Sequence, residues 1–344
     1  MTDKEICIVG GGIAGAGAAY ALDEADVTVY EMDTVGGRMA SRRREGCVFD
    51  FGANYLELGD SDLESVIEDG AGDVAVEIES SVEQFTAGGE IQTGVVPQNT
   101  RWTTPDGLDG IVRALFENSG ADLHVGVGVT RLERRENDWL VTTDEGERAF
   151  DAVVLAVPGA SASVLFETAV WDNPIKDELV QAVEEIPYRA MDTVALGYPF
   201  EIETDFFGLL SEEDVYDIAW VSNEGHKPDH VPDGRGVLIV QFGPSWAVTH
   251  PQTSPAAASE AATNRVVELL DDDRLGEPAW WEYQRWGDAV PTHGPDESLR
   301  EATLEDDLAL AGDWVEGIGR TRAALRSGLR AGRQLRQVEG NDTK

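Results

Sequence analysis

Short apolar runs alternate with helix-compatible segments along most of the chain. The first run, Ile6–Val9, leads into a glycine-rich stretch at 10–15 and then into small residues as far as Leu22. A second apolar run, Val27–Tyr30, follows closely. This order predicts a strand, a tight turn, a helix and a second strand, which together form a βαβ unit.

The same patterns predict further elements downstream. Strands are expected at 123–127, 139–143, 152–156, 193–197, 218–221, 237–242 and 308–313, with weaker alternation at 74–78. Helices are expected at 111–118, 256–270 and 321–338. Paired strand and helix elements thus fall at the beginning, middle and end of the sequence. We therefore expect an α/β protein with a second domain inserted near 167–289.

The glycines between the first strand and helix each have a physical task. Gly10 permits the tight turn, and Gly12 lets the backbone approach a pyrophosphate. Gly15 allows the helix and strand to pack closely, while the helix N-terminus offers free N–H groups to the phosphates. Glu31 ends the second strand, where its carboxylate can accept hydrogen bonds from a ribose diol and repel a 2′-phosphate. The pattern predicts a dinucleotide-binding site.

Charge is the outlier in the composition. The 344 residues include 66 acidic and 26 basic side chains, for a formal net charge of −40. The lysines are Lys4, Lys176, Lys227 and Lys344. Such an acidic, lysine-poor composition resembles that of proteins from organisms with molar internal salt, where a Debye length of ~3 Å screens self-repulsion. A field this negative repels phosphate backbones, so no nucleic-acid partner is expected.

Length and cysteine content set further bounds. The chain is long enough for two domains, or for one domain with a large insertion. No apolar run reaches the roughly 18 residues of a membrane span, and the charged segment Met1–Glu5 predicts no secretory signal. We interpret Cys7 and Cys47 as reduced packing thiols. Together these features predict a cytoplasmic protein without a membrane partner, from a high-salt organism.

Further motifs make the chain resemble the renalase-like oxidoreductases of the flavin-containing amine oxidase superfamily. They agree with that family in order and spacing, and they cover its FAD-binding parts. The motifs are the glycines at 10–15 with Glu31, and the runs Gly36–Met39, Asp50–Tyr55, Pro105–Leu108, Asp151–Pro158, Gln284–Trp286, Gly312–Asp313 and Ser327–Gly328.

The resemblance implies a two-domain architecture. One domain would be a Rossmann-type FAD-binding domain of the glutathione-reductase and amine-oxidase kind, discontinuous in sequence at 1–75, 100–166 and 290–344. The other would be an α+β substrate domain built on a mixed sheet, at 76–99 and 167–289.

The resemblance also implies which residues contact FAD. Val129 would contact adenine through its backbone, and Gly312–Asp313 would hold the ribityl and phosphate groups. The last helix would point its N-terminus at the pyrimidine end of the flavin, which carries negative charge when reduced. The expected contacts are Gly10, Gly12, Ile13, Ala14, Gly15, Glu31, Met32, Gly36, Gly37, Arg38, Met39, Gly52, Ala53, Asn54, Val129, Ala156, Pro158, Gly312, Asp313, Thr321 and Arg322.

Other residue types are missing from the positions where relatives use them. No cysteine follows Cys47, so the C-terminal thioether of monoamine oxidases cannot form, and FAD is expected to be noncovalent. Neither Lys176 nor Lys227 matches the context of the lysine that polyamine-oxidase relatives place near flavin N5. His226 and His230 have a spacing that suits a metal on a helix, but a proline between them indicates a loop. No metal site is therefore expected.

Aromatic residues suggest the substrate pocket. In renalase-like proteins the tryptophan of the Arg-Trp pair lies beside the flavin, and Trp286 matches it. We expect Trp286, together with Tyr55, to line the substrate pocket, where a flat indole would hold a planar ring and exclude water. Ordinary packing explains the neighbouring pair Trp280 and Trp281, one of which is expected to face inward on a strand.

Arginines gather in two acid-free segments, 38–44 and 317–338. They could form a positive field that holds the FAD pyrophosphate and steers an anionic substrate. Alternatively, they could pair with acidic neighbours. Pairing is the expectation for Arg330, Arg333 and Arg336, whereas both interpretations stay open for Arg42–Arg44.

The resemblance implies an FAD-dependent oxidase. It would take a hydride from a reduced, isomeric nicotinamide nucleotide at flavin N5 and pass the electrons to O₂. Two alternatives stay open: a flavin amine oxidase or carotenoid-type desaturase, and a non-catalytic flavin-binding protein. A desaturase would need a long apolar tunnel and membrane contact, which the acidic composition disfavours. The sequence leaves the physiological substrate, the electron acceptor and the oligomeric state open.

The charge leads to a prediction about salt. We expect the fold to loosen at low ionic strength, because self-repulsion among the acids is then unscreened. The measurement is the melting temperature in dilute buffer and in molar KCl. Equal melting temperatures in the two solutions would contradict this interpretation of the charge.

Overall fold

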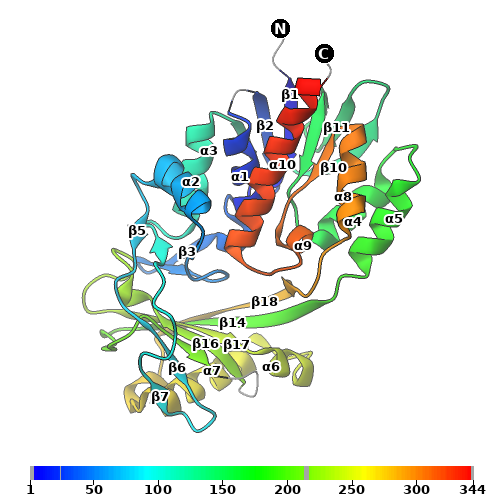
Figure 1. Ribbon diagram of the computed structural model, residues 1–344. Coiled ribbons are helices and arrows are strands. Elements are labelled where there is room, and N and C mark those ends of the chain that lie inside the picture. Colours follow the sequence, from blue (N-terminus) through cyan, green and yellow to red (C-terminus); the bar gives the residue numbers. More distant parts are fainter. Residues whose placement is uncertain (1–3, 24, 213–216, 342–344) are drawn as a thin grey trace.

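The computed structural model describes residues 4–23, 25–212 and 217–341. A parallel five-stranded sheet, in the order β19-β13-β1-β2-β9, forms one part of the molecule (Figure 1). Its strands are β1 (Glu5–Val9), β2 (Asp26–Glu31), β9 (Asp122–Val125), β13 (Ala152–Leu155) and β19 (Leu308–Leu310). Since β1 is central, the glycine turn that follows it lies at the middle of the carboxyl edge of this sheet.

Alternate residues of these strands pack into different layers, because successive side chains of a strand point to opposite faces. Ile6 and Ile8 pack against a helical layer. Cys7 and Val9 pack into a second layer, which holds a three-stranded sheet and two helices. The helical layer contains α1 (Ile13–Ala21), α2 (Ser61–Ala71), α3 (Asp109–Ser119) and α10 (Thr321–Asn341). The second layer contains β10 (Val129–Arg134), β11 (Trp139–Thr143), β12 (Glu147–Phe150), α4 (Gly159–Thr168) and α5 (Ile175–Glu184).

A mixed seven-stranded sheet forms the other part of the molecule, in the order β18-β14-β17-β16-β15-β6-β7. All neighbouring pairs are antiparallel except β15 and β6. Its strands are β6 (Val82–Phe85), β7 (Ile91–Gln92), β14 (Tyr188–Tyr198), β15 (Gly208–Ser211), β16 (Ile218–Asn223), β17 (Gly236–Phe242) and β18 (Trp280–Pro291). Helices α6 (Pro244–Thr249) and α7 (Pro255–Leu270) cover one face (Figure 1). The opposite face packs on β4 (Cys47–Asp50) and Phe51.

Short elements connect these layers. They are η1 (Gly37–Met39), β3 (Ser41–Arg44), β5 (Val76–Glu77), β8 (Trp102–Thr103), η2 (Glu224–His226), η3 (Asp273–Gly276), α8 (Glu297–Thr303), η4 (Leu304–Asp306) and α9 (Asp313–Glu316). Strand β3 pairs with β4, and β5 pairs with β8. No helix among the described residues combines the length and the apolar character needed to cross a bilayer.

The expected α/β fold with a Rossmann-like part and a mixed sheet is confirmed, with local differences. The strand predicted at 308–313 ends at Leu310, and Asp313 instead begins α9, because Gly312 (φ 143°) turns the chain between them. The alternation at 74–78 forms a strand only at 76–77, because β8 offers just two pairing residues there. The last helix extends three residues beyond 338, to Asn341.

Helices α1 and α10 approach each other through glycines. A Cβ atom on Gly17 would lie 2.9 Å from the Leu325 carbonyl oxygen. A Cβ on Gly328 would collide with the Ala14 carbonyl oxygen. These missing side chains let the last helix lie directly against the first, next to the glycine turn.

We predict that Gly328→Ala destabilises the protein. In the interior of a helix, alanine is ordinarily more stabilising than glycine by ~1 kcal/mol. Here, however, its methyl group would push α10 away from α1. Overpacking of this kind costs about 1–3 kcal/mol. Denaturant unfolding measures the change, and Gly287→Ala is the matched control because no heavy atom lies within 4 Å of that added Cβ. Equal stability of the two variants would contradict the prediction.

Candidate functional site

Bare backbone lines the turn between β1 and α1. Gly10 has a φ of 114°, and a Cβ on Gly15 would collide with the Gly10 carbonyl oxygen. At Gly12 a Cβ would meet only the Gly36 carbonyl oxygen, at 3.9 Å. No side chain caps α1, so its first turn, with Ile13 and Ala14, presents backbone N–H groups to this space.

Glu31 lies beside this turn. Its two carboxylate oxygens accept hydrogen bonds from the backbone N–H groups of Gly11, at 2.6 Å, and Asp33, at 2.9 Å. The acid therefore holds the glycine turn against the end of β2, and each oxygen keeps a further lone pair for a ligand hydroxyl.

A second strip of bare backbone runs alongside. The Gly36 N–H donates to the Gly11 carbonyl oxygen at 2.9 Å, and a Cβ on Gly37 would lie 3.8 Å from the Gly12 Cα. Met39 packs its side chain into the helical layer. Arg38 forms a two-pronged ion pair with Asp313, at 2.6 and 2.8 Å. The pair joins the N-terminal glycine strips to the start of α9.

The remaining predicted contacts lie around the same carboxyl edge. The backbone N–H groups of Gly126 and Val127 donate to the Glu31 carbonyl oxygen. This turn leads to Val129, the first residue of β10. Met32 is 75% exposed, and a Cβ on Gly128 would lie 3.4 Å from its Cγ. Ala156 follows β13 against Gly10, and Pro158 precedes α4.

Helix α10 begins at Thr321, as the sequence predicts. Arg322 lies 3.5 Å from Glu57, and Arg326 lies 2.9 Å from Asp60. Arg330 and Arg336 also pair with acids, Glu316 and Asp23. Pairing thus extends along most of this helix.

The arginines whose role stayed open are paired as well. Arg42 and Arg44 both reach Glu282, at 3.3 and 3.6 Å, and Arg43 lies 3.6 Å from Asp106. The structure therefore supports pairing with acidic neighbours for these three arginines.

The segment after β4 runs between the two sheets. A Cβ on Gly52 would collide with the Arg38 carbonyl oxygen and would lie 3.4 Å from the Trp286 ring. Ala53 donates its N–H to the same Arg38 oxygen, at 2.9 Å. The Asn54 side chain accepts from the Ser222 hydroxyl at 3.1 Å. This segment, Gly52–Asn54, is thus fixed to both sides of the molecule.

A row of side chains on the seven-stranded sheet faces this segment, and we call it the substrate face. Strand pairing aligns Trp220, Gln241, Thr193 and Gln284 across β16, β17, β14 and β18. Gln241 donates to the Gly52 carbonyl oxygen at 2.6 Å. Trp286 lies two residues beyond Gln284 and therefore on the same face.

Polar atoms of the substrate face are buried without partners. Within the described part of the chain, Trp220 Nε1, Thr193 Oγ1 and Trp286 Nε1 are buried and have no hydrogen-bond partner. An unsatisfied buried polar group costs about 1–3 kcal/mol. Several such atoms on one face indicate that a ligand completes this region.

Tyr55 and Trp286 lie at different ends of the substrate face. The Tyr55 ring centroid is 5.6 Å from that of Trp220, and the Arg101 guanidinium is 5.4 Å from the Tyr55 ring. Burial raises the pKa of Tyr55, although Arg101 opposes the shift, so the phenol is neutral. As expected for the tryptophan pair, Trp280 is buried while Trp281 is 39% exposed.

Sequence reasoning missed a buried charged cluster. Lys227, assigned only to a loop, has no exposed side-chain surface, and its ammonium contacts Asp50 and Glu224. His230 joins this cluster, whereas His226 hydrogen-bonds to Ser80 and Thr204. The buried location of a lysine has no signal in the local sequence, because its partner Asp50 lies 177 positions away.

Opposing effects act on the ionisable groups of this cluster. Burial alone would raise the pKa of Asp50, but the charges of Lys227 and His230 hold it below its ordinary value. Burial would lower the pKa of Lys227, but Asp50 and Glu224 raise it above its ordinary value. Both directions favour a charged pair.

The fold and glycine strips define a dinucleotide-binding protein. Comparison with known proteins narrows this class. Residues 8–69 match the NAD(P)-binding Rossmann-like domain, and residues 75–336 match the flavin containing amine oxidoreductase family. The chain therefore belongs to the flavin-containing amine oxidoreductase family, is an FAD-dependent enzyme, and acts on a small-molecule substrate.

Individual relatives are distant. The chain is 23% identical to renalase from Mus musculus over 288 residues, which cover 78% of this chain and 80% of that protein. It is 27% identical to polyamine oxidase 2 from Arabidopsis thaliana over 51% of this chain and 34% of that protein. Cyclohexylamine oxidase from Brevibacterium oxydans shares the fold, with a TM-score of 0.75 at 14% identity, over 98% of this chain and 100% of that one.

The residues present fit FAD. The glycine strips around Gly12 and Gly37 leave a backbone-lined cradle, and the uncapped start of α1 suits a pyrophosphate. The two glycine strips and the uncapped N-terminus of α1 thus lie together and suit the pyrophosphate of FAD.

We predict that Arg38→Lys weakens both the fold and FAD binding. Lysine keeps the charge but cannot form the two-pronged pair with Asp313. We expect a loss of about 1–2 kcal/mol in unfolding free energy, since the pair is charge-assisted but partly screened by solvent. FAD titration should show weaker binding. Arg113→Lys is the control, because its pair with Asp109 joins residues of one helix turn and Arg113 is 51% exposed; equal losses in both variants would argue against this role of Arg38.

Proposed function

We propose that this flavoenzyme oxidises a reduced, isomeric nicotinamide nucleotide and passes the electrons to O₂. The observation that carries the proposal is the set of buried, unpartnered polar atoms on the substrate face. The likeness to renalase over most of both chains supports the same substrate class.

The chemistry of the substrate face favours a nicotinamide over an amine. The indole N–H groups of Trp220 and Trp286 can only donate hydrogen bonds, and the Thr193 hydroxyl can donate as well. Donors suit the carboxamide oxygen of a nicotinamide ring. A protonated amine offers no acceptor, and Glu282, an acid on this face, is already paired with Arg42 and Arg44.

Each part of the site then has a role. Bound FAD supplies the acceptor for a hydride. Trp286 would flank the planar substrate ring and exclude water, and Tyr55 would close the opposite end of the pocket. The glycine strips, Glu31, Arg38 with Asp313, Val129 and the first turn of α10 would hold the cofactor noncovalently.

Domain limits and cellular setting belong to the same proposal. The cofactor would be held by 1–75, 100–166 and 290–344, and the substrate by 76–99 and 167–289. The acidic composition supports a high-salt cytoplasm as the place of action.

We predict that dihydronicotinamide isomers, and not amines, bleach the flavin absorption of the purified holoprotein under anaerobic conditions. Readmitted O₂ should restore the yellow colour and yield H₂O₂. The measurement is the visible spectrum after each reductant in a small panel. Bleaching by amines alone would assign an amine oxidase, and the absence of bleaching by every reductant would favour a non-catalytic flavoprotein.

A matched pair of variants locates the substrate in this experiment. Thr193→Val removes the hydroxyl while keeping the shape of the side chain. We expect bleaching at limiting reductant to be about tenfold slower, which corresponds to the loss of one hydrogen bond to the substrate. Thr263→Val is the control, since Thr263 is buried on α7, across the sheet from the substrate face. Equal rates for both variants would place the substrate elsewhere.

A further inference from the structure

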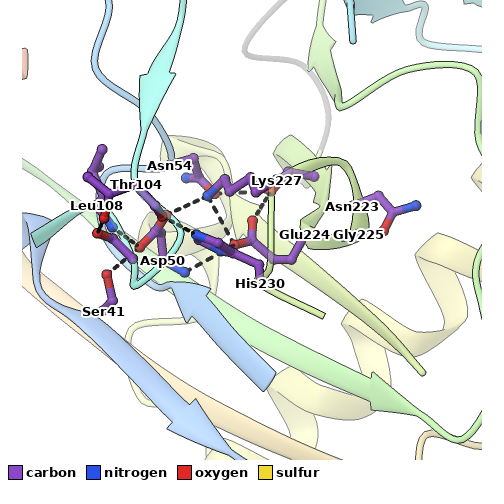
Figure 2. Close-up of polar contacts among 12 residues, drawn as sticks. Ser41, Asp50, Asn54, Thr104, Leu108, Asn223, Glu224, Gly225, Lys227 and His230 are labelled. Atoms are coloured by element: carbon purple, nitrogen blue, oxygen red, sulfur yellow. Dashed lines mark hydrogen bonds and ion pairs between the residues drawn. The ribbon is translucent and has the colours of Figure 1, made fainter. Parts of the chain in front are cut away.

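Four ionisable side chains with no exposed surface meet where β4 contacts the seven-stranded sheet (Figure 2). The Lys227 ammonium lies 2.6 Å from Asp50 Oδ2 and 3.0 Å from Glu224 Oε2. His230 Nδ1 lies 3.2 Å from the same Glu224 oxygen. We call these residues the buried tetrad.

The tetrad joins segments that are distant in sequence. Asp50 ends β4, and its Oδ1 accepts hydrogen bonds from the Ser41 hydroxyl and the Leu108 N–H. Glu224, Lys227 and His230 follow β16 of the seven-stranded sheet. His230 Nε2 also contacts the Thr104 carbonyl oxygen, at 2.9 Å. The tetrad therefore joins β4 to the seven-stranded sheet by buried polar contacts, beside the apolar contacts of Phe49 and Phe51.

Three side chains of the tetrad lie close enough together to share one cation. Oxygen and nitrogen donors of Asp50, Glu224 and His230 all lie within 4.8 Å of one another. Two carboxylates and an imidazole are a donor set that zinc accepts in proteins. Here the Lys227 ammonium lies against both carboxylates. Its charge is needed because two carboxylates without a cation would be very costly to bury.

The buried tetrad is connected to Gly52–Asn54, the segment that lies against the substrate face. Asp50 is two residues before Gly52, whose carbonyl oxygen accepts from Gln241. A second route runs through Ser222, whose hydroxyl donates to Asn54 Oδ1 at 3.1 Å and contacts Glu224 Oε1 at 3.4 Å. Movement of Asp50 or Glu224 would therefore move Gly52–Asn54.

We propose that the Lys227 ammonium takes the place that a metal ion would occupy between Asp50, Glu224 and His230. We further propose that Lys227 is a positioning residue, which holds Gly52–Asn54 in place through Asp50 and Glu224. Its importance for the flavin environment rests on the proposed placement of Gly52–Asn54 beside FAD. The cation site itself depends on no substrate or reaction. Buried ion pairs often add little net stability, so the expected role of Lys227 is to fix one geometry of the tetrad.

The first test asks whether the site accepts a metal once the ammonium is removed. Lys227→Ala leaves the three other side chains and opens space between them. Calorimetric titration of the full-length holoprotein with Zn²⁺, in high salt to screen the acidic surface, should show one site that binds roughly 100-fold tighter than in the unmodified protein. In the double variant Lys227→Ala, His230→Gln this site should be lost. Equal Zn²⁺ binding by the unmodified protein, the single variant and the double variant would overturn the proposal.

The second test measures positioning by the flavin spectrum, which requires no turnover. Lys227→Ala should shift the visible flavin band and raise flavin fluorescence, and one equivalent of Zn²⁺ should restore both. Lys227→Met, which fills the space without a charge, should show the same shift and no response to Zn²⁺. Unaltered flavin spectra in both variants would overturn the positioning role.

The yield of folded protein is the readout for a variant that does not fold well enough for a flavin spectrum. Should Lys227→Ala fail to fold without metal, Zn²⁺ during refolding should recover it but should not recover the double variant. Failure of Zn²⁺ to distinguish the two would count against the proposal. Because these tests use no reductant, an incorrect substrate assignment leaves their outcomes unchanged.

Discussion

Helix α1 packs closely against both the glycine turn and α10, and the rest of the structure depends on this constraint. Gly15 lets α1 approach the turn after β1, and Gly328 lets the last helix lie against Ala14. The first and last parts of the chain are thereby brought to one edge of the parallel sheet. Arg38 and Asp313, 275 positions apart, can then form their ion pair beside the cofactor cradle. Without this approach the two halves of the proposed FAD site would not meet.

The seven-stranded sheet meets this site through the segment around β4 and through ion pairs of β3. Strand β4 and Phe51 pack on its apolar side chains, and Gly52–Asn54 continues along the substrate face. Most of the contact is apolar and non-directional, so it fixes proximity more than orientation. Directional contacts are added by Gln241, Ser222, the buried tetrad and the pairs of Arg42 and Arg44 with Glu282. A buried charged cluster at the border of an apolar interface fits a requirement for one geometry next to the proposed cofactor site.

The acidic composition shapes how the basic residues are used. Arginines that look like a positive field in the sequence mostly pair with acids, such as Arg42 with Glu282 and Arg326 with Asp60. Exposed pairs of this kind contribute little stability individually. They do neutralise acids around the N-terminal end of α10. This pairing reduces the negative charge around the cofactor site that we propose at the N-terminal end of α10.

The sequence by itself determined the βαβ unit, the strands of both sheets that carry strong apolar runs, and the family. These features depend on local patterns and on glycines whose spacing has a direct steric meaning, as at Gly10 and Gly15. Only the tertiary structure decided which polar residues meet. The row from Trp220 to Gln284 comes from strand pairing between distant segments, and Lys227 meets its partner Asp50 across an interface. Local sequence encodes which way a side chain alternates along its own strand, whereas its partner on another strand depends on how the whole chain packs.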